Sequence, residues 1–480
     1  MRNILFRTKP LGELLAETQE SGHTLKKTLR VWDLIALGIG CIIGVGIFVL
    51  PGVEAATHAG PGIILSFAIA ALACACSAIC YAELAAMIPV AGSAYTYGYA
   101  TLGELPAWII GWDLLLEYMV AACLVSIGWS AYFVNLFNNI LRPWKIALPT
   151  SLTNAPVDWS DTLLKFVRTG AVINVPAIFI IGLLVLLLVR GIKESSRVNI
   201  IIVIVKISVI IFFIVLAVWY IKPSNWTPFM PFGFGGVMTA AAIVFLAFVG
   251  FDAVSTAAEE AVNPQRDMPI GIIGSLVVAT VLYISVSAIM TGVVPYYKLG
   301  VPDPVALVLN ELKMPWASII VSLGAIAGIT SVLLVLLLGQ PRILFAMSRD
   351  GLLPPFLSKV HWKYQTPHMT TVLTGIIVAV ASALLPIRVV AELCSIGTLF
   401  AFVIVCLGVI ALRYSRADMV RPFKVPFFPV LPALGALLCA YLMINLPATA
   451  WTRFVIWLVI GLTIFFLYGR RHSRLAKRQP

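Results

Sequence analysis

The sequence is dominated by long blocks of apolar residues. The clearest are Ile63–Cys80, Val172–Val189, Ile200–Tyr220 and Ile319–Leu338. Each approaches the roughly 20 residues that an α-helix needs to cross the hydrocarbon core of a bilayer. Only 11% of the 480 residues are charged, whereas soluble proteins carry about 25%. The chain is therefore predicted to be an all-α polytopic membrane protein. This excludes a soluble enzyme, a nucleic-acid-binding domain and a secreted disulfide-rich module.

Apolar runs, together with the polar segments that separate them, predict twelve membrane spans. Their centres lie near residues 44, 75, 118, 181, 208, 248, 282, 328, 378, 402, 437 and 460. If both termini are cytoplasmic, most of the 33 Lys and Arg residues fall in internal segments, as the positive-inside rule requires. The net charge of +12 then reflects topology, and no nucleic-acid partner is expected. We expect a multi-pass protein of the cell membrane, surrounded by the lipid bilayer, with cytoplasmic N- and C-termini.

Cysteine placement and missing motifs narrow the function further. All eight cysteines fall within predicted spans, where Cys behaves as a small apolar residue. No structural disulfide is expected, and no external loop offers a cysteine to a glycoprotein subunit. The sequence contains no Walker, dinucleotide-binding or HExxH motif, so we expect no cofactor, no metal and no enzymatic activity.

Two of the predicted spans are interrupted. The first carries four glycines, Gly38, Gly40, Gly44 and Gly46. A glycine inside a helix costs about 1 kcal/mol relative to alanine, so an unwound segment is predicted at Gly44-Val45-Gly46, although close helix packing is the alternative. The sixth span has Gly250 followed by the charged Asp252. Discontinuous helices at matching places in two halves indicate an inverted-repeat secondary transporter with its site near the membrane midplane.

Ionisable residues inside the apolar runs are candidate functional groups, because each costs at least ~2.5 kcal/mol on insertion scales. Lys206 lies deep in the fifth span and can exchange a proton or hold a positive charge where a sodium ion would bind; a snorkelling lysine is the alternative. Glu117 and Asp252 are expected either to support the broken helices or to act directly on substrate or protons. Glu83 is expected to be a solvated helix end.

Six segments carry a resemblance to a known family: GIGCIIGVGIFVLPG, AGSAYTYGYATLGELPAWIIGWDLLLEY, FLAFVGFDAVSTAAEE followed by NPQRDMPIGI, FAMSRDGLLPP, ELCSIGTLFAF and RPFKVPFFPVLP. From about Leu29 to about Trp457 the chain resembles the amino acid–polyamine–organocation superfamily. The last three segments resemble its cationic amino acid transporter branch and the bacterial relatives of that branch. The resemblance implies a LeuT-type fold of twelve helices, in which ten form two inverted five-helix repeats and helices 1 and 6 are broken.

On this basis the chain is divided into four parts. They are a cytosolic N-terminal segment (1–30), a transport core (31–412, with repeats at about 31–221 and 237–412), helices 11 and 12 with their connector (413–468), and a basic cytosolic tail (469–480).

The resemblance also implies a substrate site. The backbone amides around Gly44, Val45 and Gly46 would receive an α-carboxylate, as helix N-termini commonly do. The residues whose carbonyls would receive the α-ammonium group are Ile42, Leu246, Ala247 and Val249. Lys206 matches the lysine that replaces the sodium site in proton-coupled members, and Glu117 and Asp252 match acids that link the core helices.

The substrate itself is inferred from the side-chain pocket. The residues expected there, Leu246, Ala247 and Leu333, are apolar and include no acid for an arginine or lysine side chain. A small neutral L-amino acid such as alanine, carried with protons by alternating access, is therefore the first prediction. An amino acid exchanger, a permease for arginine or lysine, and an amino acid sensor without turnover are the alternatives.

Overall fold

The computed structural model of the chain describes residues 7, 29–87, 95, 98–99, 103–141, 144, 147–160, 165–190, 196–255, 258, 261–359, 361, 366–415, 417 and 419–475. Most of the predicted N-terminal segment 1–30, most of the motif between residues 91 and 102, and the last five residues of the basic tail lie outside the described residues.

Within the described residues, seven helical stretches are long and apolar enough to cross a membrane, and five shorter apolar helices accompany them. The long stretches contain α5 (Ile63–Met87), α7 (Glu104–Leu141), α9 (Ser196–Ala217), α12 (Pro264–Val293), α14 (Pro315–Arg349), α16 (Ile387–Ser415) and α18 (Ala448–Ile464). The shorter helices are α2 (Val31–Ile42), α8 (Val175–Arg190), α10 (Gly233–Val244), α15 (His368–Leu384) and α17 (Val430–Ile444). The chain is a multi-pass membrane protein, as its apolar blocks predict.

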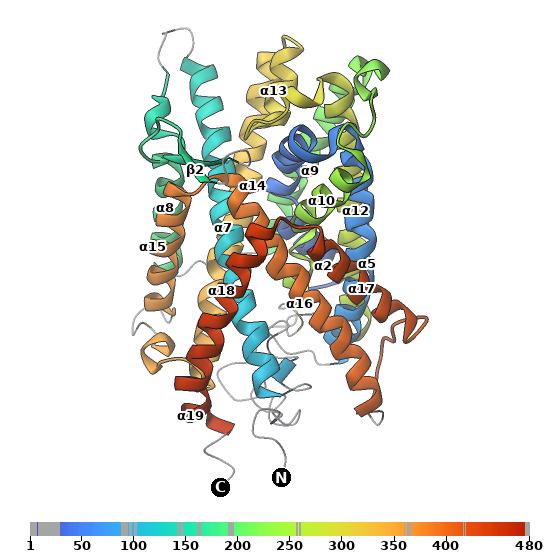
Figure 1. Cartoon of the computed structure of the whole chain (residues 1–480), viewed down its shortest axis with the longest axis vertical. Coiled ribbons are helices and arrows are strands. Elements are labelled where there is room, and N and C mark those ends of the chain that lie inside the picture. Colours follow the sequence, from blue (N-terminus) through green and yellow to red (C-terminus); the bar gives the residue numbers. More distant parts are fainter. Residues whose placement is uncertain are drawn as a thin grey trace.

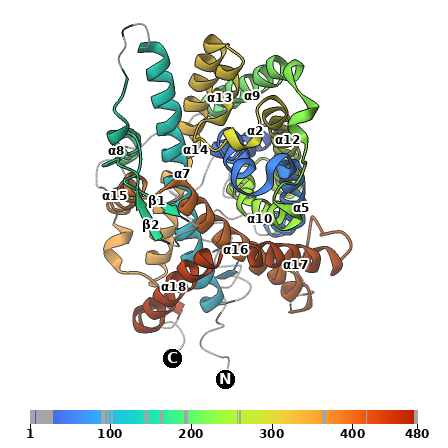
Figure 2. The ribbon, with the colours of Figure 1, turned by 45° about the horizontal axis from the view of Figure 1, so that its top comes forward.

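The helices form two packed groups (Figures 1 and 2). Helix α12 contacts both α2 and α5, and α10 packs against α5, while α7 contacts α14, α15 and α8 on the other side. Helix α16 contacts both α7 and α5, so it joins the two groups. Apolar side chains fill the interfaces between these helices as one continuous core.

The two ends of the molecule differ in structure. The upper part in Figure 1 holds α13 (Pro304–Glu311) and an antiparallel hairpin of β1 (Val157–Ser160) and β2 (Lys165–Arg168). The prediction of an all-α chain is therefore wrong for this segment. Apolar and polar residues alternate in VDWS but not in KFVR, so only β1 shows the period of a strand. The antiparallel pairing provides backbone hydrogen bonds between the two strands.

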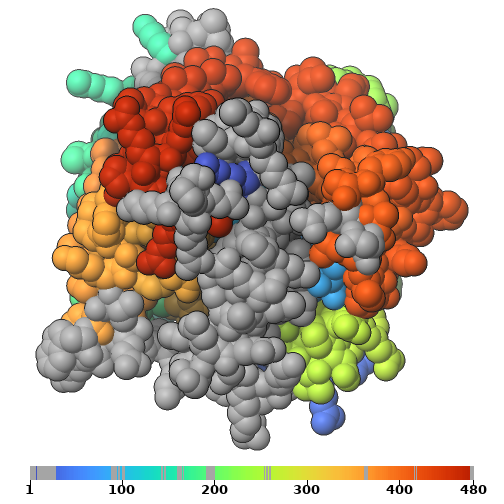
Figure 3. Space-filling model, turned by 90° about the horizontal axis from the view of Figure 1, so that it is seen from below, coloured from blue at the N-terminus to red at the C-terminus, as the bar shows by residue number. Residues whose placement is uncertain are grey.

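The lower end carries the short C-terminal helix α19 (Arg470–His472). Figure 3 looks onto this face, where the orange end of α16 and its connector border the yellow-green start of α12. Helix α17 follows that connector. The C-terminal end of α16 therefore reaches the same side of the molecule as the C-terminal helix α19.

Both predicted helix interruptions are present. Helix α2 ends at Ile42, and the chain resumes as α3 (Val45–Phe48), with Gly44 at φ −153° and ψ −131°. The second break follows α10 and the 3-10 turn η8 (Phe245–Phe248), before α11 (Phe251–Ser255). Gly250 has φ +123° there, and a Cβ on it would lie 2.8 Å from the backbone of Cys41. Only glycine fits this conformation and this close approach.

Candidate functional site

The two helix breaks lie on either side of a cavity of about 60 Å³. This is several times the ~10–15 Å³ that one buried water requires. Helices α7 and α14 supply the remaining walls. Of the residues predicted to bind substrate, those that line the cavity are Ile42, Gly44, Val45, Gly46, Leu246, Ala247 and Val249.

Leu333 does not line the cavity, so its predicted place is wrong. Its side chain is buried, while Val332, Val335 and Leu336 of the same helix α14 form the wall. A helix turns by about 100° per residue, so residues 332, 335 and 336 share a face from which residue 333 points away. The pocket nevertheless remains aliphatic on this side.

The break between α2 and α3 exposes backbone donors to the cavity. Ile47 and Phe48 donate their N–H groups to the carbonyl of Gly44, at 3.2 and 3.4 Å. The N–H groups of Val45 and Gly46 precede them in the first turn of α3, where a helix has no internal acceptors to offer. Because both residues line the cavity, these two amides can bind an anionic group there.

Tyr283 of α12 contacts both helix breaks through its hydroxyl group. Its hydroxyl oxygen lies 2.8 Å from the carbonyl oxygen of Ile42 and 2.6 Å from that of Ala247. A tyrosine hydroxyl has one proton and can donate it to one acceptor at a time. Tyr283 is fully buried. The sequence offered no signal for this residue beyond a single tyrosine within the apolar run VLYISV.

Lys206 lies against the end of α2. Its side chain is 1% exposed, and its Nζ donates to the carbonyls of Gly40 at 2.8 Å and Ile43 at 3.1 Å. The last carbonyls of a helix lack internal donors and carry partial negative charge. The alternative of a snorkelling lysine is therefore wrong. The ammonium group sits outside the cavity lining, directly behind the broken backbone.

Gly328 of α14 makes room for the lysine stem. A Cβ at this glycine would lie 2.9 Å from Cγ of Lys206. The small residue thus lets α14 approach the aliphatic chain closely, and the stem packs while its charged end reaches α2.

The two acids take different positions. Asp252 lines the cavity and is 2% exposed. Its Oδ1 accepts a hydrogen bond from the N–H of Gly250 at 3.1 Å, so it supports the broken backbone. Glu117 of α7 is buried and does not line the cavity. It faces α16, where Cys394 contacts its backbone carbonyl at 3.6 Å.

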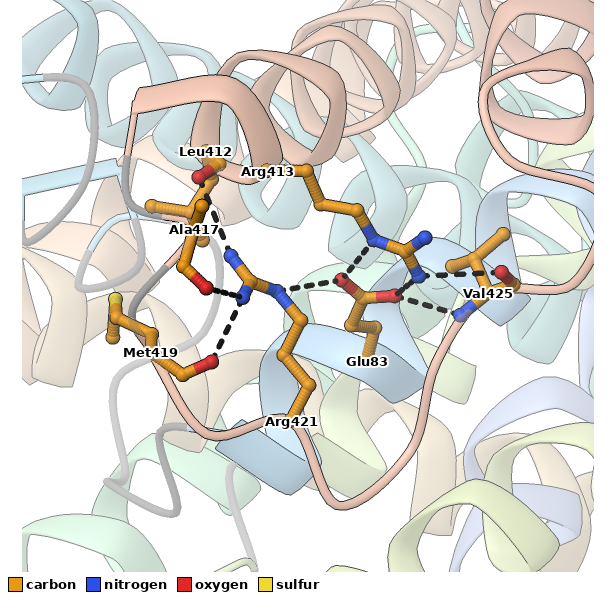
Figure 4. Close-up of polar contacts among 7 residues, drawn as sticks. All are labelled: Glu83, Leu412, Arg413, Ala417, Met419, Arg421 and Val425. Carbon is orange, nitrogen blue, oxygen red and sulfur yellow. Dashed lines mark hydrogen bonds and ion pairs between the residues drawn. The ribbon is translucent and has the colours of Figure 1, made fainter.

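Glu83 is not a solvated helix end, so that prediction is wrong. Its carboxylate is 1% exposed and forms ion pairs with Arg413 and Arg421 (Figure 4). It also accepts the N–H of Val425 at 2.7 Å. The partners come from the end of α16 and the connector that follows it, and the sequence could not show that this segment folds back onto α5.

A second charged cluster lies at the other end of α16. Arg388 and Arg453 each approach the buried carboxylate of Glu392, at 3.4 Å. Arg388 also lies 3.3 Å from Nε2 of His58, whose Nδ1 is 2.8 Å from Glu54. Charged contacts therefore hold α16 at both of its ends.

Comparison with known proteins places the chain in a family. The family described as amino acid permease matches residues 29–467. A branched-chain amino acid permease of Bacillus subtilis (strain 168) is 52% identical over 477 residues, covering 99% of this chain and 100% of the relative. A methylthioribose transporter of the same organism is 49% identical, with 98% and 99% covered. A vacuolar cationic amino acid transporter of Arabidopsis thaliana is 31% identical, with 98% and 96% covered.

These matches confirm the resemblance found in the sequence motifs, including the cationic amino acid transporter branch and its bacterial relatives. Members of this family are membrane transporters and not enzymes. The chain belongs to the amino acid permease family of the amino acid–polyamine–organocation superfamily.

Proposed function

We propose that this permease is a proton-coupled symporter of an apolar neutral L-amino acid, with alanine as the first candidate. The observation that carries the proposal is the buried ammonium group of Lys206 on the carbonyls of Gly40 and Ile43, at the break between α2 and α3. While protonated, this ammonium group would take the place in which a sodium ion would otherwise be coordinated. Its contacts depend on the shape of the broken helix, so its protonation is tied to that shape.

The fold proposed for this function is the LeuT-type arrangement of twelve helices. The paired breaks at Gly44 and Gly250 support it, as do the apolar helices found in or beside each predicted span. The division into repeats at about 31–221 and 237–412, and cytoplasmic termini in the cell membrane, belong to the same proposal. Alternating access would then move one packed group of helices against the other around the cavity.

The substrate would bind through its backbone groups. The amides of Val45 and Gly46 would hold the α-carboxylate, and carbonyls from the two breaks would hold the α-ammonium group. The carbonyl of Leu246 already accepts the N–H of Val249 at 3.1 Å, and that of Ala247 contacts Tyr283. Each carbonyl oxygen has two lone pairs, so both can accept a further hydrogen bond from the ligand.

The cavity wall favours a neutral aliphatic side chain over a basic one. Ala121, Leu124 and Val125 of α7 face Val332 and its neighbours on α14. The acid in the lining, Asp252, already accepts a backbone hydrogen bond. A branched-chain amino acid is the second candidate, because this aliphatic wall suits one and the relative that is 52% identical is named a branched-chain amino acid permease.

The test is transport in proteoliposomes of the purified protein. Labelled alanine, valine, leucine, isoleucine, arginine and methylthioribose are compared, with and without an imposed pH gradient. We expect accumulation of a neutral amino acid that a protonophore abolishes. Lys206→Ala should remove the gradient-driven accumulation, whereas Lys222→Ala, at an exposed loop lysine, should leave it unchanged.

Three results would replace the proposal. Accumulation by Lys206→Ala that ignores the pH gradient would remove the coupling role of the lysine. Uptake that requires internal amino acid and no gradient would identify an exchanger. Binding detected by calorimetry without counterflow would identify a sensor.

A further inference from the structure

Asp113 is a buried acid that the substrate site does not use. It lies on α7, its side chain is 0% exposed, and neither of its carboxylate oxygens has a hydrogen-bond partner among the described residues. Buried polar groups in proteins are nearly always paired, so an unpaired one calls for a physical explanation. Inside a membrane, an ionisable group without a partner is by default a functional candidate.

Asp113 and Glu117 share one face of α7, because residues four apart on a helix lie above one another. Asp113 is nearer the end of the helix that the charge distribution assigns to the cytoplasm. Glu117 in turn interacts with Asp252 at the cavity. The three acids therefore form a series that begins with Asp252 in the cavity lining and continues along α7 through Glu117 to Asp113.

The surroundings of Asp113 contain one other acid and one thiol but no cation in the described part of the chain. Glu117 on its own helix and Cys394 on α16 are its ionisable neighbours. Gly397 of α16 lies opposite, and a Cβ on it would be 3.0 Å from Oδ1 of Asp113. Because Gly397 has no side chain, α16 leaves room for the carboxyl group of Asp113. An unpaired carboxylate in such surroundings is costly, and the group avoids that cost by holding a proton.

We propose that Asp113 is a proton-binding residue and forms, with Glu117, a two-carboxyl relay between Asp252 and the cytoplasmic side. The inference rests on the proposed proton coupling. In the transfer step Asp113 first releases its proton toward the cytoplasmic side; the O–H bond of Glu117 then breaks and an O–H bond forms on Asp113, leaving a carboxylate at Glu117, and no group is oxidised or reduced. The relay holds at least one proton because two carboxylates that share a buried site do not both ionise.

The first test detects the proton directly. Infrared difference spectra of the purified protein in lipid vesicles are recorded across a pH titration, and Asp113→Asn should remove a carboxyl C=O band of a protonated acid. Glu311→Gln, at an acid that is 47% exposed, is the matched control and should leave that band in place. Gly397→Ala keeps the acid but crowds it, so it should shift the band.

The second test separates proton handling from substrate handling. Asp113→Asn should reduce uptake driven by a pH gradient by roughly 100-fold, the lower end of what a positioned proton donor contributes. Substrate counterflow, which moves no net proton, should stay at the level of the unsubstituted protein. Asp113→Glu should restore part of the driven uptake.

A carboxyl band that survives Asp113→Asn overturns the inference. So does a parallel loss of driven uptake and counterflow that Asp113→Glu does not reverse, since that is the result of a structural role. Thermal unfolding of each variant reports whether it folds, and Gly397→Ala supplies the spectroscopic readout if the Asn variant does not. If the unsubstituted protein ignores the gradient while the band still depends on Asp113, the proposed coupling fails and the proton-binding site stands.

Discussion

At the scale of single residues, the substrate site depends on a glycine that no larger residue can replace. A Cβ on Gly46 would lie 2.7 Å from Cβ and 2.8 Å from Cα of Ala247. We expect Gly46→Ala to push α3 away from η8, at a cost of about 1–3 kcal/mol, and to abolish binding. The stabilisation of the purified protein by neutral amino acids in thermal unfolding measures this, because a ligand stabilises the state it binds.

The control for Gly46 lies on α8. A Cβ at Gly182 would meet no atom within 4 Å, so Gly182→Ala should retain ligand-dependent stabilisation. If Gly46→Ala still binds neutral amino acids, the two helix breaks can move apart without loss of binding. That result would argue against a substrate site between them.

At the scale of elements, α16 and its connector depend on Glu83 of α5 (Figure 4). Removing one partner of a buried ion pair leaves the other uncompensated and typically costs about 3–5 kcal/mol. We therefore expect Glu83→Gln to lower the thermal unfolding temperature markedly. Proteolysis or hydrogen exchange of residues 419–429 should show where the connector detaches.

The exposed pair of Lys298 and Glu311 provides the comparison for this prediction. Both side chains are about half exposed and 3.6 Å apart, and such surface pairs contribute about 0–1 kcal/mol. Lys298→Gln should leave the unfolding temperature nearly unchanged. Equal effects of the two substitutions would mean that the Glu83 cluster does not anchor the connector.

At the scale of the whole molecule, the proposed orientation puts the β1–β2 hairpin outside and α19 inside. All eight cysteines are buried, so an introduced cysteine can be labelled against a low background. We expect Lys165→Cys to react with a membrane-impermeant maleimide in intact cells. Arg471→Cys should react only after permeabilisation. Labelling in the reverse order would invert the topology.

The general architecture was accessible to sequence reasoning because its signals are local. Apolar blocks of membrane length identify spans wherever they pack, and the glycines at Gly44 and Gly250 disfavour a helix through their own backbone freedom. The β1–β2 hairpin was missed because its strands have only four residues each and KFVR does not alternate, so a search for apolar blocks does not detect them.

The site was predictable in part. The residues at the breaks came from motifs, and Lys206 stood out because a lysine in an apolar run is rare. Leu333 was misplaced by one residue on α14, since a motif match does not fix the rotation of a helix about its axis. Tyr283 was missed because nothing in its own segment marks a tyrosine that reaches two carbonyls of other helices.

The sequence alone was enough to show that the chain lies in a membrane and where its helices are interrupted. Those properties follow from the cost of exposing polar groups to lipid and from backbone preferences, and both act over a few neighbouring residues. Helix packing sets the partner of each buried charge: carbonyls of α2 for Lys206, two arginines for Glu83 and, among the described residues, no hydrogen-bond partner for the Asp113 carboxylate. Glu83 and Arg413 are 330 residues apart, and only the packing of whole helices determines which such side chains meet.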